Sequence, residues 1–554
     1  MIWGFGNLKI FCKKRNTKGK KFSHKNKAVK TINNYLRQFR EAFRTDSDPI
    51  LTLKYVIFFS AIIGLISQII SYSSGLIFAY NDAGLHLDVA RRFYDSRDPG
   101  FANQIGVVWL PLPHLILAPF VYFDVLWITG LAGSIVGFFY YIATCGFLYR
   151  ILRHVTGENH SALFGLAFFA LNPNILYLYS TAMTEPLFIL LICISIYHIF
   201  NWLNTEFSGE IVRAGIAAGL ACMTRYEAWW FTILTGILMF MIALFYGKKH
   251  PFKNLFYFFL VPALAILWYL YHNWSVAGDI LAFQRGQYSS AAQVELRYAS
   301  IGGAPYKHNL LLSTDIINSA ILYNTGYVLL AAGVVGFLIY IFNKKMKLDS
   351  LIPVLLLLFY PFNILSMYTG QVSVELPTTF PKGYFQSRYV IAILPGLAIF
   401  LGYLLMKIKN INFRLITFII LFLINNLWFS VVWPIGVAAI GEAQTSFLMS
   451  QSFRRVAYYL KTFYNHENIL YDDFSIIFFA GTGIPIKERI HDYSWDYGEA
   501  AMKSPSQYVG WIIINSLNKN DKIGIAMKDN LDFQERFRLV LNEGGIEVYK
   551  RVDK

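Results

Sequence analysis

Residues 55–81 read YVIFFSAIIGLISQIISYSSGLIFAYN, and residues 82–100 continue as DAGLHLDVARRFYDSRDPG. The first stretch has no charged residue and is longer than the roughly 20 apolar residues that cross a bilayer, so it predicts a membrane-spanning helix. The second stretch is dense in charge, and a Trp- and Pro-rich segment, WLPLPH at 109–114, follows it. A charged loop directly after a span is where we expect the functional site.

The composition of the whole chain is that of a membrane protein. Of its 554 residues, 56% are hydrophobic and only 15% are charged, which is too little charge for a soluble protein of this size. Eleven apolar runs predict a polytopic α-helical membrane protein with about 11 transmembrane helices. The runs begin near Tyr55, Val125, Ser161, Pro186, Ala214, Ala228, Asn254, Ile316, Leu351, Tyr389 and Leu415.

The N-terminal segment, residues 1–54, is strongly basic. It carries 14 Lys or Arg against three acidic residues, so +11 of the net charge of +16 precedes the first span. Segments of this kind stay on the cytoplasmic side and contact anionic lipid headgroups. Because topology and lipid contact explain the charge, we expect membrane lipid and no nucleic acid as its partner. The first span has no small-residue cleavage site after it and is expected to be a retained signal anchor.

One further apolar stretch, residues 99–123, decides the orientation of every later loop. It contains Pro111, Pro113 and Pro119, and we expect it to re-enter the membrane or to lie on its surface. With that assignment all basic clusters between spans face the cytoplasm together with the N-terminal segment, as the positive-inside rule requires. The clusters are Arg150 and Arg153; Lys248, Lys249 and Lys253; Lys344, Lys345 and Lys347; and Lys407, Lys409 and Arg414.

This topology brings polar residues from five separate segments to the outer face, within a membrane domain of residues 55–440 whose outer loops are 82–124 and 278–315. They are Asp82, His86, Asp88, Arg91, Arg92, Asp95 and Asp98 in the first loop, then Glu185, Arg225 with Glu227, the loop 278–315, and Arg388. A carboxylate at the end of a membrane span, such as that of Asp82, costs folding free energy unless it is paired or functional.

Residues 441–554 also fall outside and differ in character, because charge rises and uncharged runs vanish. They predict a small C-terminal α/β extracytoplasmic domain. We expect strands at 508–515, 522–527 and 547–551, and helices at 453–463 and 533–543.

Helical spacing organises the first outer loop. Asp82 and His86 are four residues apart and would share one face of a helix. Asp88 with Arg92, and Arg91 with Asp95, have the spacing of salt bridges. The simplest interpretation of residues 88–95 is therefore a solvated helix held by these local pairs.

The order of these features resembles that of the GT-C glycosyltransferases, and most closely their protein O-mannosyltransferase and aminoarabinose transferase branch. The resemblance covers about residues 50–435 and rests on the basic tail, the first span, an outer loop that opens on an acid, the WLPLPH segment and a terminal soluble domain. It implies an integral membrane enzyme that moves a sugar from a polyprenyl-phosphate donor to an acceptor at the extracytoplasmic face, with inversion. The acceptor would be a protein, glycolipid or glycan.

The resemblance also implies residue roles. The family's catalytic acid corresponds to Asp82, but many members have a second acid directly after it, where this chain has Ala83. This leaves open whether Glu185 or His86 takes the second role. TAMTEPLF (181–188), TRYEAWW (224–230) and SRYVIAILPGLAIF (387–400) are similar to other segments of the family.

Sugar transfer from a lipid phosphate requires specific residue types. Negative charge grows on the leaving phosphate, and arginine can hold it bidentately. A carboxylate can accept the proton of the acceptor, the role we assign to Asp82. The candidates for binding the donor phosphate or the substrate are Arg225, Glu227, Arg285, Arg388, Trp109 and His114.

No metal or other cofactor is predicted. The four cysteines lie in the basic segment or in apolar runs, the sequence has neither HExxH nor CxxC, and Asp82 with His86 supplies only two ligands. Some GT-C relatives use a divalent ion, so a metal stays an alternative. A transporter or flippase of a lipid-linked sugar is a second alternative, and an outer-leaflet glycan ligase is a third. Transporters have broken helices and charges in mid-membrane, whereas the polar residues here gather at one face.

Overall fold

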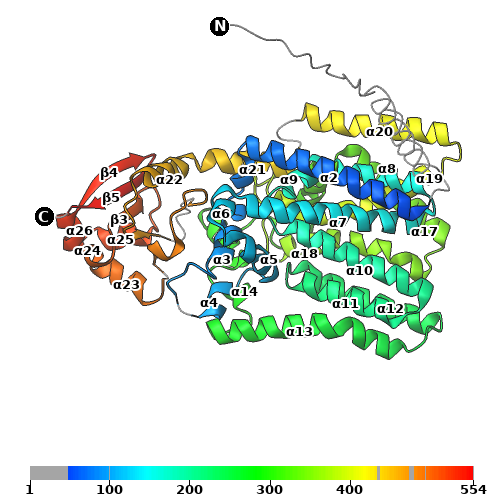
Figure 1. Cartoon of the computed structure of the whole chain (residues 1–554), viewed down its shortest axis with the longest axis horizontal. Helices are drawn as coiled ribbons and strands as arrows, with labels where there is room; N and C mark the ends of the chain where they lie inside the picture. The colour runs from blue at the N-terminus through cyan, green and yellow to red at the C-terminus, as the bar shows by residue number, and fades with distance from the viewer. Residues whose placement is uncertain (1–47, 99, 433–436, 473–478, 493, 553–554) are drawn as a thin grey trace, which may run out of the picture.

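The computed structural model describes residues 48–98, 100–432, 437–472, 479–492 and 494–552, so almost all of the basic segment 1–54 lies outside the described residues. A bundle of long apolar helices makes up most of the molecule, and a five-stranded sheet with short helices stands at one end of it (Figure 1). The bundle is that of an integral membrane protein, because its long helices are apolar enough to cross a bilayer.

Eight helices in the described chain are long and apolar enough to span. They are α2 (Pro49–Ser73), α7 (Leu131–Thr156), α10 (Glu185–Thr205), α12 (Glu227–Phe245), α13 (Pro251–Ala277), α17 (Tyr327–Lys344), η5 with α19 (Ser387–Met406) and α20 (Ile411–Val431). A bent pair, Leu348–Leu357 with Phe359–Tyr368, makes up to nine. The expected count of eleven is not confirmed. The runs near Ser161 and Ala214 form α8 (Asn159–Ala170) and α11 (Ser208–Cys222), which have 12 and 15 residues and are short for a span.

The described part of the Pro-rich stretch, residues 100–123, folds against the end of the bundle. It forms α4 (Phe101–Ile105) and α5 (Leu112–Val121), and α5 has only 10 residues. Arg91, the last residue of α3 (Asn81–Arg91), donates to the carbonyl of Val121 at 2.6 Å and forms an ion pair with Asp124 of α6 (Asp124–Thr129). The stretch is therefore held beside α3 by these contacts.

The lysine-rich turns lie together at the opposite end. Leu348 donates its backbone N–H to the Tyr246 hydroxyl (3.1 Å), which joins the turn after α17 to the turn after α12. Arg414, at the start of α20, forms an ion pair with Glu158 after α7. In Figure 1 these turns are at the right-hand end, whereas α3 and the sheet are toward the left. The basic turns and Asp82 are thus at opposite ends of the bundle.

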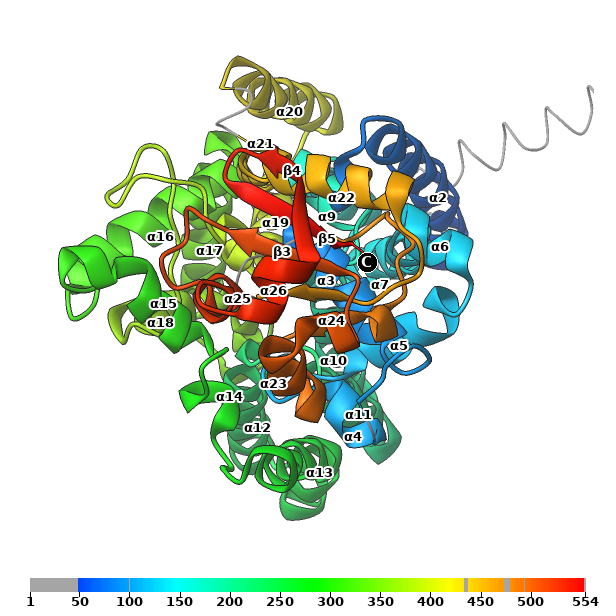
Figure 2. The ribbon, with the colours of Figure 1, turned by 90° about the vertical axis from the view of Figure 1, so that its left-hand side faces the viewer.

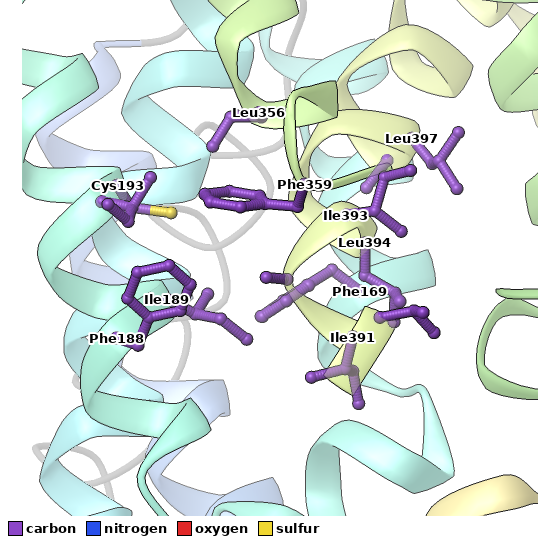
Figure 3. Packing of buried hydrophobic residues seen from close by; sticks show 14 of the residues in the cluster. Phe169, Phe188, Ile189, Cys193, Leu356, Phe359, Ile391, Ile393, Leu394 and Leu397 are labelled. Atoms are coloured by element: carbon purple, nitrogen blue, oxygen red, sulfur yellow. The ribbon is translucent and has the colours of Figure 1, made fainter. Parts of the chain in front are cut away.

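A packed apolar core lies inside the bundle, next to the segments of α10 and η5 that carry Glu185 and Arg388. Figure 3 shows Phe188 of α10, Phe359 of α18 (Phe359–Tyr368) and Ile391 of η5 in this core. The rings of Phe188 and Phe359 meet edge to face with centroids 5.3 Å apart. Phe188 follows Glu185 by three residues and Ile391 follows Arg388 by three, so close packing here fixes the backbone that carries both polar residues.

The C-terminal sheet has the strand order β2-β1-β3-β5-β4, with β1, β2 and β3 parallel and the remaining pairs antiparallel. The strands are β1 (Ile469–Tyr471), β2 (Arg489–His491), β3 (Trp511–Asn515), β4 (Phe537–Glu543) and β5 (Ile546–Arg551). The predicted helix 453–463 is α22 (Gln451–Phe463), and the strands predicted at 508–515 and 547–551 are β3 and β5.

Two secondary-structure predictions in this domain are wrong. Residues 522–527 form helix α25 (Lys522–Met527), because the side chain of Asp521 accepts from the Gly524 amide and caps a helix. The predicted helix 533–543 covers the end of α26 (Leu531–Arg536) and all of strand β4, which pairs with β5. Pairing with a distant strand overrides local propensity there.

The remaining elements are short. They are η1 (Leu76–Phe78), α9 (Pro173–Leu178), α14 (Ala282–Arg285), α15 (Ser290–Tyr298), η2 (Ala299–Ile301), α16 (Leu310–Thr325), α21 (Ala438–Met449), η6 (Ile486–Glu488), α23 (Trp495–Lys503) and α24 (Pro505–Tyr508).

Candidate functional site

Asp82 and Arg388 form the centre of the site. Asp82 is in the first turn of α3, and Arg388 is the second residue of η5. Arg388 Nη2 forms an ion pair with Asp82 Oδ2. The side chain of Arg388 is 4% exposed and that of Asp82 is 38% exposed. A buried guanidinium therefore presents one edge to a carboxylate at the surface of the site.

Two buried glutamates hold the rest of the Arg388 guanidinium. Its Nη1 donates to Glu442 Oε1 at 2.8 Å, and its Nε lies 3.2 Å from Glu185 Oε1. Both carboxylates are almost completely buried. A buried charge is stable only where it is paired, so these two residues account for the position of Arg388.

The ion pairs continue from Glu185 to Arg225. Arg225 Nη1 lies 2.9 Å from the same Oε1 atom of Glu185 and 3.1 Å from Thr184 Oγ1. Its Nε and Nη2 donate to Glu227 Oε1 at 3.0 and 2.7 Å. Arg225 and Glu227 thus pair with each other, and Glu185 bridges this pair to Arg388. Five residues from four of the segments named in the sequence analysis, together with Glu442, therefore form one network.

Aromatic rings cover the two guanidinium groups. The ring of Tyr389 lies between them, with its centroid 4.8 Å from Arg225 and 5.4 Å from Arg388. The ring of Tyr80 lies 4.7 Å from Arg388. Cation–π contacts of this kind stabilise guanidinium groups away from water. The polar edges of Arg388 face Asp82, Glu185 and Glu442.

Glu442 is a site residue that the sequence did not indicate. It lies in α21, two residues beyond the predicted end of the membrane domain, in the weakly polar segment AAIGEAQ (438–444). A single acid among Ala and Gly residues next to the last span is the only sequence signal for it. The same physical argument that selected Asp82, the cost of a carboxylate in an apolar setting, applies to this residue.

The network carries more negative than positive charge. It contains the carboxylates of Asp82, Glu185, Glu227 and Glu442 against the guanidinium groups of Arg225 and Arg388. Of the four acids, Asp82 is by far the most exposed. It is therefore the carboxylate that a substrate can reach, whereas the buried acids orient the arginines.

His86 lies one turn after Asp82 but pairs elsewhere. Its Nδ1 is 2.9 Å from His114 Nε2, and its ring packs on Trp109 with centroids 4.2 Å apart. Burial, aided by the positive charges of Arg388 and Arg225, lowers the pKa of His86 from 6.5 to about 3. His86 is therefore neutral at physiological pH.

Of the two ion pairs predicted within the first outer loop, only one is present. Asp88 pairs with Arg489 of the C-terminal domain at 2.6 Å, so the predicted local pair with Arg92 is wrong. The predicted Arg91–Asp95 contact is present at 3.9 Å.

Arg285 is exposed at the end of α14, and no ion pair links it to the rest of the described chain. The structure therefore does not join Arg285 to the network.

The described residues contain no group of three or more His, Cys, Asp or Glu side chains arranged to hold a metal ion. Three of the four cysteines, at positions 145, 193 and 222, are buried free thiols, and Cys12 lies outside the described residues. The donors in the network are carboxylates already paired with arginine, which is a poor set for a cation.

The fold is similar to that of two proteins of known structure. The crystal structure of ArnT from Cupriavidus metallidurans bound to undecaprenyl phosphate has a TM-score of 0.55 with this chain, at 11% identity, over 90% of this chain and 98% of that chain. The archaeal oligosaccharyltransferase AglB from Archaeoglobus fulgidus, in complex with an inhibitory peptide and a dolichol-phosphate, matches with a TM-score of 0.49 at 8% identity, over 83% of this chain and 69% of that chain.

No protein-family model matches the sequence, and no curated protein matches it significantly. The similarity to ArnT confirms the predicted fold: the chain has the fold of the GT-C glycosyltransferases, a helical membrane bundle that ends in a small sheet domain.

Proposed function

We propose that the protein is a glycosyltransferase that moves a sugar from a polyprenyl-phosphate donor to an acceptor hydroxyl or amine at the extracytoplasmic face of the membrane. One observation carries this proposal. Within a GT-C fold, the exposed carboxylate of Asp82 is held against the buried guanidinium of Arg388. An accessible base beside a cation matches the two needs of the reaction, proton removal and stabilisation of a leaving phosphate.

The residues take distinct roles in this scheme. The acceptor oxygen or nitrogen attacks the anomeric carbon, and the bond from that carbon to the phosphate oxygen breaks with its electron pair on the phosphate. Asp82 accepts the proton of the acceptor. Arg388 and Arg225 stabilise the negative charge on the leaving group. A single base without a covalent intermediate gives inversion at the anomeric carbon.

The part of the family's second acid, which the sequence left open between Glu185 and His86, is taken by Glu185 as a residue that positions the arginines. Glu185 contacts both arginines through one oxygen and is almost completely buried, which suits it to hold them apart at a fixed distance. Glu227 does the same for Arg225 alone. His86, neutral and bound to His114, helps to hold helix α3 in place. Contact of Trp109, His114 and Arg285 with a substrate stays a prediction.

A polyprenyl phosphate is supported as the donor carrier by the undecaprenyl phosphate bound to ArnT, whose fold this chain shares. The acceptor belongs to the broader class of proteins, glycolipids and glycans. We place the basic turns in the cytoplasm by the positive-inside rule. Since Asp82 and the C-terminal sheet are at the other end of the bundle, both would then face outward.

The donor specificity tests the proposal. Purified protein is incubated with peptide, glycolipid and glycan acceptors and with undecaprenyl-phosphate hexose, dolichyl-phosphate hexose or an undecaprenyl-diphosphate-linked glycan, and the released lipid is measured by mass spectrometry. We expect free polyprenyl phosphate from a monophosphate donor. A flippase would leave every glycolipid intact, and a glycan ligase would release undecaprenyl diphosphate instead. Either result would contradict the proposal.

A further inference from the structure

The chain segment that carries Asp82 is bound on both sides by residues that follow the membrane bundle. Arg454 of α22 donates to the carbonyl of Phe78 at 2.7 Å, four residues before Asp82. Arg489 of β2 pairs with Asp88, six residues after it, at 2.6 Å. Figure 2 shows the C-terminal domain in front of the bundle, with α3 behind the sheet.

The ion pair between Arg489 and Asp88 is buried, and further hydrogen bonds hold both side chains. The Arg489 side chain is 5% exposed. Its Nε and Nη2 donate to the carbonyl of Ile484 at 3.1 and 2.6 Å, so its remaining donor group points at Asp88. The second oxygen of Asp88 accepts from Trp127 Nε1 at 2.9 Å. Because each partner is also held by a second group, this ion pair is fixed in position, unlike a mobile surface salt bridge.

A third contact extends the same interface. The backbone N–H of Ile486 donates to Asp95 Oδ2 at 2.9 Å. Asp88 and Asp95 are therefore acceptors for the C-terminal domain, although their spacing in the sequence suggests a solvated helix. Helix α3, which contains Asp88 and ends four residues before Asp95, has only 11 residues, and helices of that length are marginal without tertiary contacts.

We infer that the C-terminal domain positions the base of the reaction: Arg489 and Arg454 hold α3 and the segment before it so that Asp82 stays against Arg388. The inference rests on the proposed function for its assignment of Asp82. Arg489 and Arg454 are positioning residues, since neither contacts Asp82 itself. The domain is thus a part of the transfer centre.

The full-length protein in detergent tests this inference with Arg489→Met, Asp88→Asn and the double variant. Arg455→Met is the matched control, because Arg455 is the neighbour of Arg454 and pairs with Glu543 inside the C-terminal domain. Two quantities are measured: hydrogen exchange of the amides of residues 81–91, and the rate of release of undecaprenyl phosphate from undecaprenyl-phosphate hexose as kcat and KM.

Arg489→Met should speed amide exchange in α3 and lower kcat by about 10- to 100-fold with little change in KM, since misplacement of a catalytic group by about 1 Å has an effect of this size. The control should match wild type in both. Arg489→Met also leaves Asp88 without its partner charge, which can destabilise the protein. The double variant removes that charge and should regain thermal stability while its kcat stays low.

Wild-type kcat in folded Arg489→Met, or in the double variant, would overturn the inference, as would unchanged exchange of α3 in both. If Arg489→Met does not fold, the double variant decides alone. These outcomes are separate from failure of the proposed function. That failure would appear as full activity of Asp82→Asn or as no release by wild type, and the exchange measurement would then still report whether Arg489 holds α3.

Discussion

Arg388 Nη1 donates to Glu442 Oε1 at 2.8 Å, and this pair joins the last membrane helices to the segment that leads into the C-terminal domain. The Glu442 carboxylate also accepts from the backbone N–H groups of Gln386 and Ser387, both at 2.8 Å. One buried acid therefore fixes the backbone before Arg388 and the guanidinium itself. The orientation of Arg388 toward Asp82 follows from this arrangement.

Replacing Glu442 by glutamine should therefore reduce both stability and transfer. Gln keeps the shape but loses the charge, and a hydrogen bond between charged groups contributes about 2 kcal/mol. We expect thermal unfolding in detergent at a lower temperature and a kcat about tenfold lower, consistent with weaker charge stabilisation. Glu499→Gln is the control, because Glu499 is exposed and pairs only with Lys503. An unfolding temperature and a kcat of Glu442→Gln equal to those of Glu499→Gln would contradict this role of Glu442.

In the proposed mechanism, the leaving lipid phosphate competes with Asp82 for the edge of Arg388 that Asp82 contacts. Because the site has an excess of carboxylates, removing the charge of Asp82 should favour an anion there. We expect Asp82→Asn to bind undecaprenyl phosphate about 5- to 10-fold more tightly than wild type, since about 1 kcal/mol of repulsion and competition is lost. Titration of the purified proteins with undecaprenyl phosphate measures this. Weaker binding by Asp82→Asn would show that the phosphate does not use this edge.

The neutral state of His86 predicts a stability change with pH. Its pKa in the folded protein is about 3, whereas the ordinary value is 6.5. Between these values the unfolded chain binds a proton that the folded protein does not, so folded-state stability falls as the pH decreases below 6.5 and is unaffected above it. At pH 5 the cost is about 2 kcal/mol.

His86→Asn should remove this part of the acid sensitivity. The measurement is the unfolding temperature of wild type and variant in detergent at pH 7.5 and pH 5. The difference between the two temperatures should be smaller for His86→Asn. His466→Asn, at an exposed histidine, should behave as wild type does. Identical acid sensitivity of His86→Asn and wild type would mean that folding does not lower the pKa of His86.

Single cysteines test the orientation of the bundle. A cysteine at Lys345, in the turn after α17, should react with a membrane-impermeant maleimide only after permeabilisation of cells. A cysteine at Ser96, in the outer loop that carries Asp82, should react in intact cells. The four native cysteines are first replaced by serine or alanine. Reaction of both sites from the same side would contradict the positive-inside assignment.

Much of the fold could be predicted from the sequence because spans are set by local composition. The apolar runs predict the long helices, and their lysine-rich ends lie together as expected. The number of spans could not be predicted, since α8 and α11 are apolar but have only 12 and 15 residues. Where each helix ends is decided by packing against neighbours.

The site was predicted in part for a similar reason. Asp82, Glu185, Arg225, Glu227 and Arg388 stand out because charge at the end of a span is conspicuous. Glu442 and the Asp88–Arg489 pair do not stand out, since each partner lies in a segment that is ordinary by itself. The partners of Asp88 and Arg388 are 401 and 54 residues away, and no local spacing rule reaches that far.

The most direct measurement of the central claim is single-turnover release of undecaprenyl phosphate from undecaprenyl-phosphate hexose by wild type, Asp82→Asn and Glu295→Gln. Glu295 is an exposed acid in the second outer loop, and no ion pair links it to the rest of the described chain, so it serves as the control. Wild type and Glu295→Gln should release the lipid at similar rates, and Asp82→Asn should be slower by about 10²- to 10⁴-fold, the usual contribution of a general base. Release at the wild-type rate by folded Asp82→Asn would contradict the assignment of Asp82 as the base.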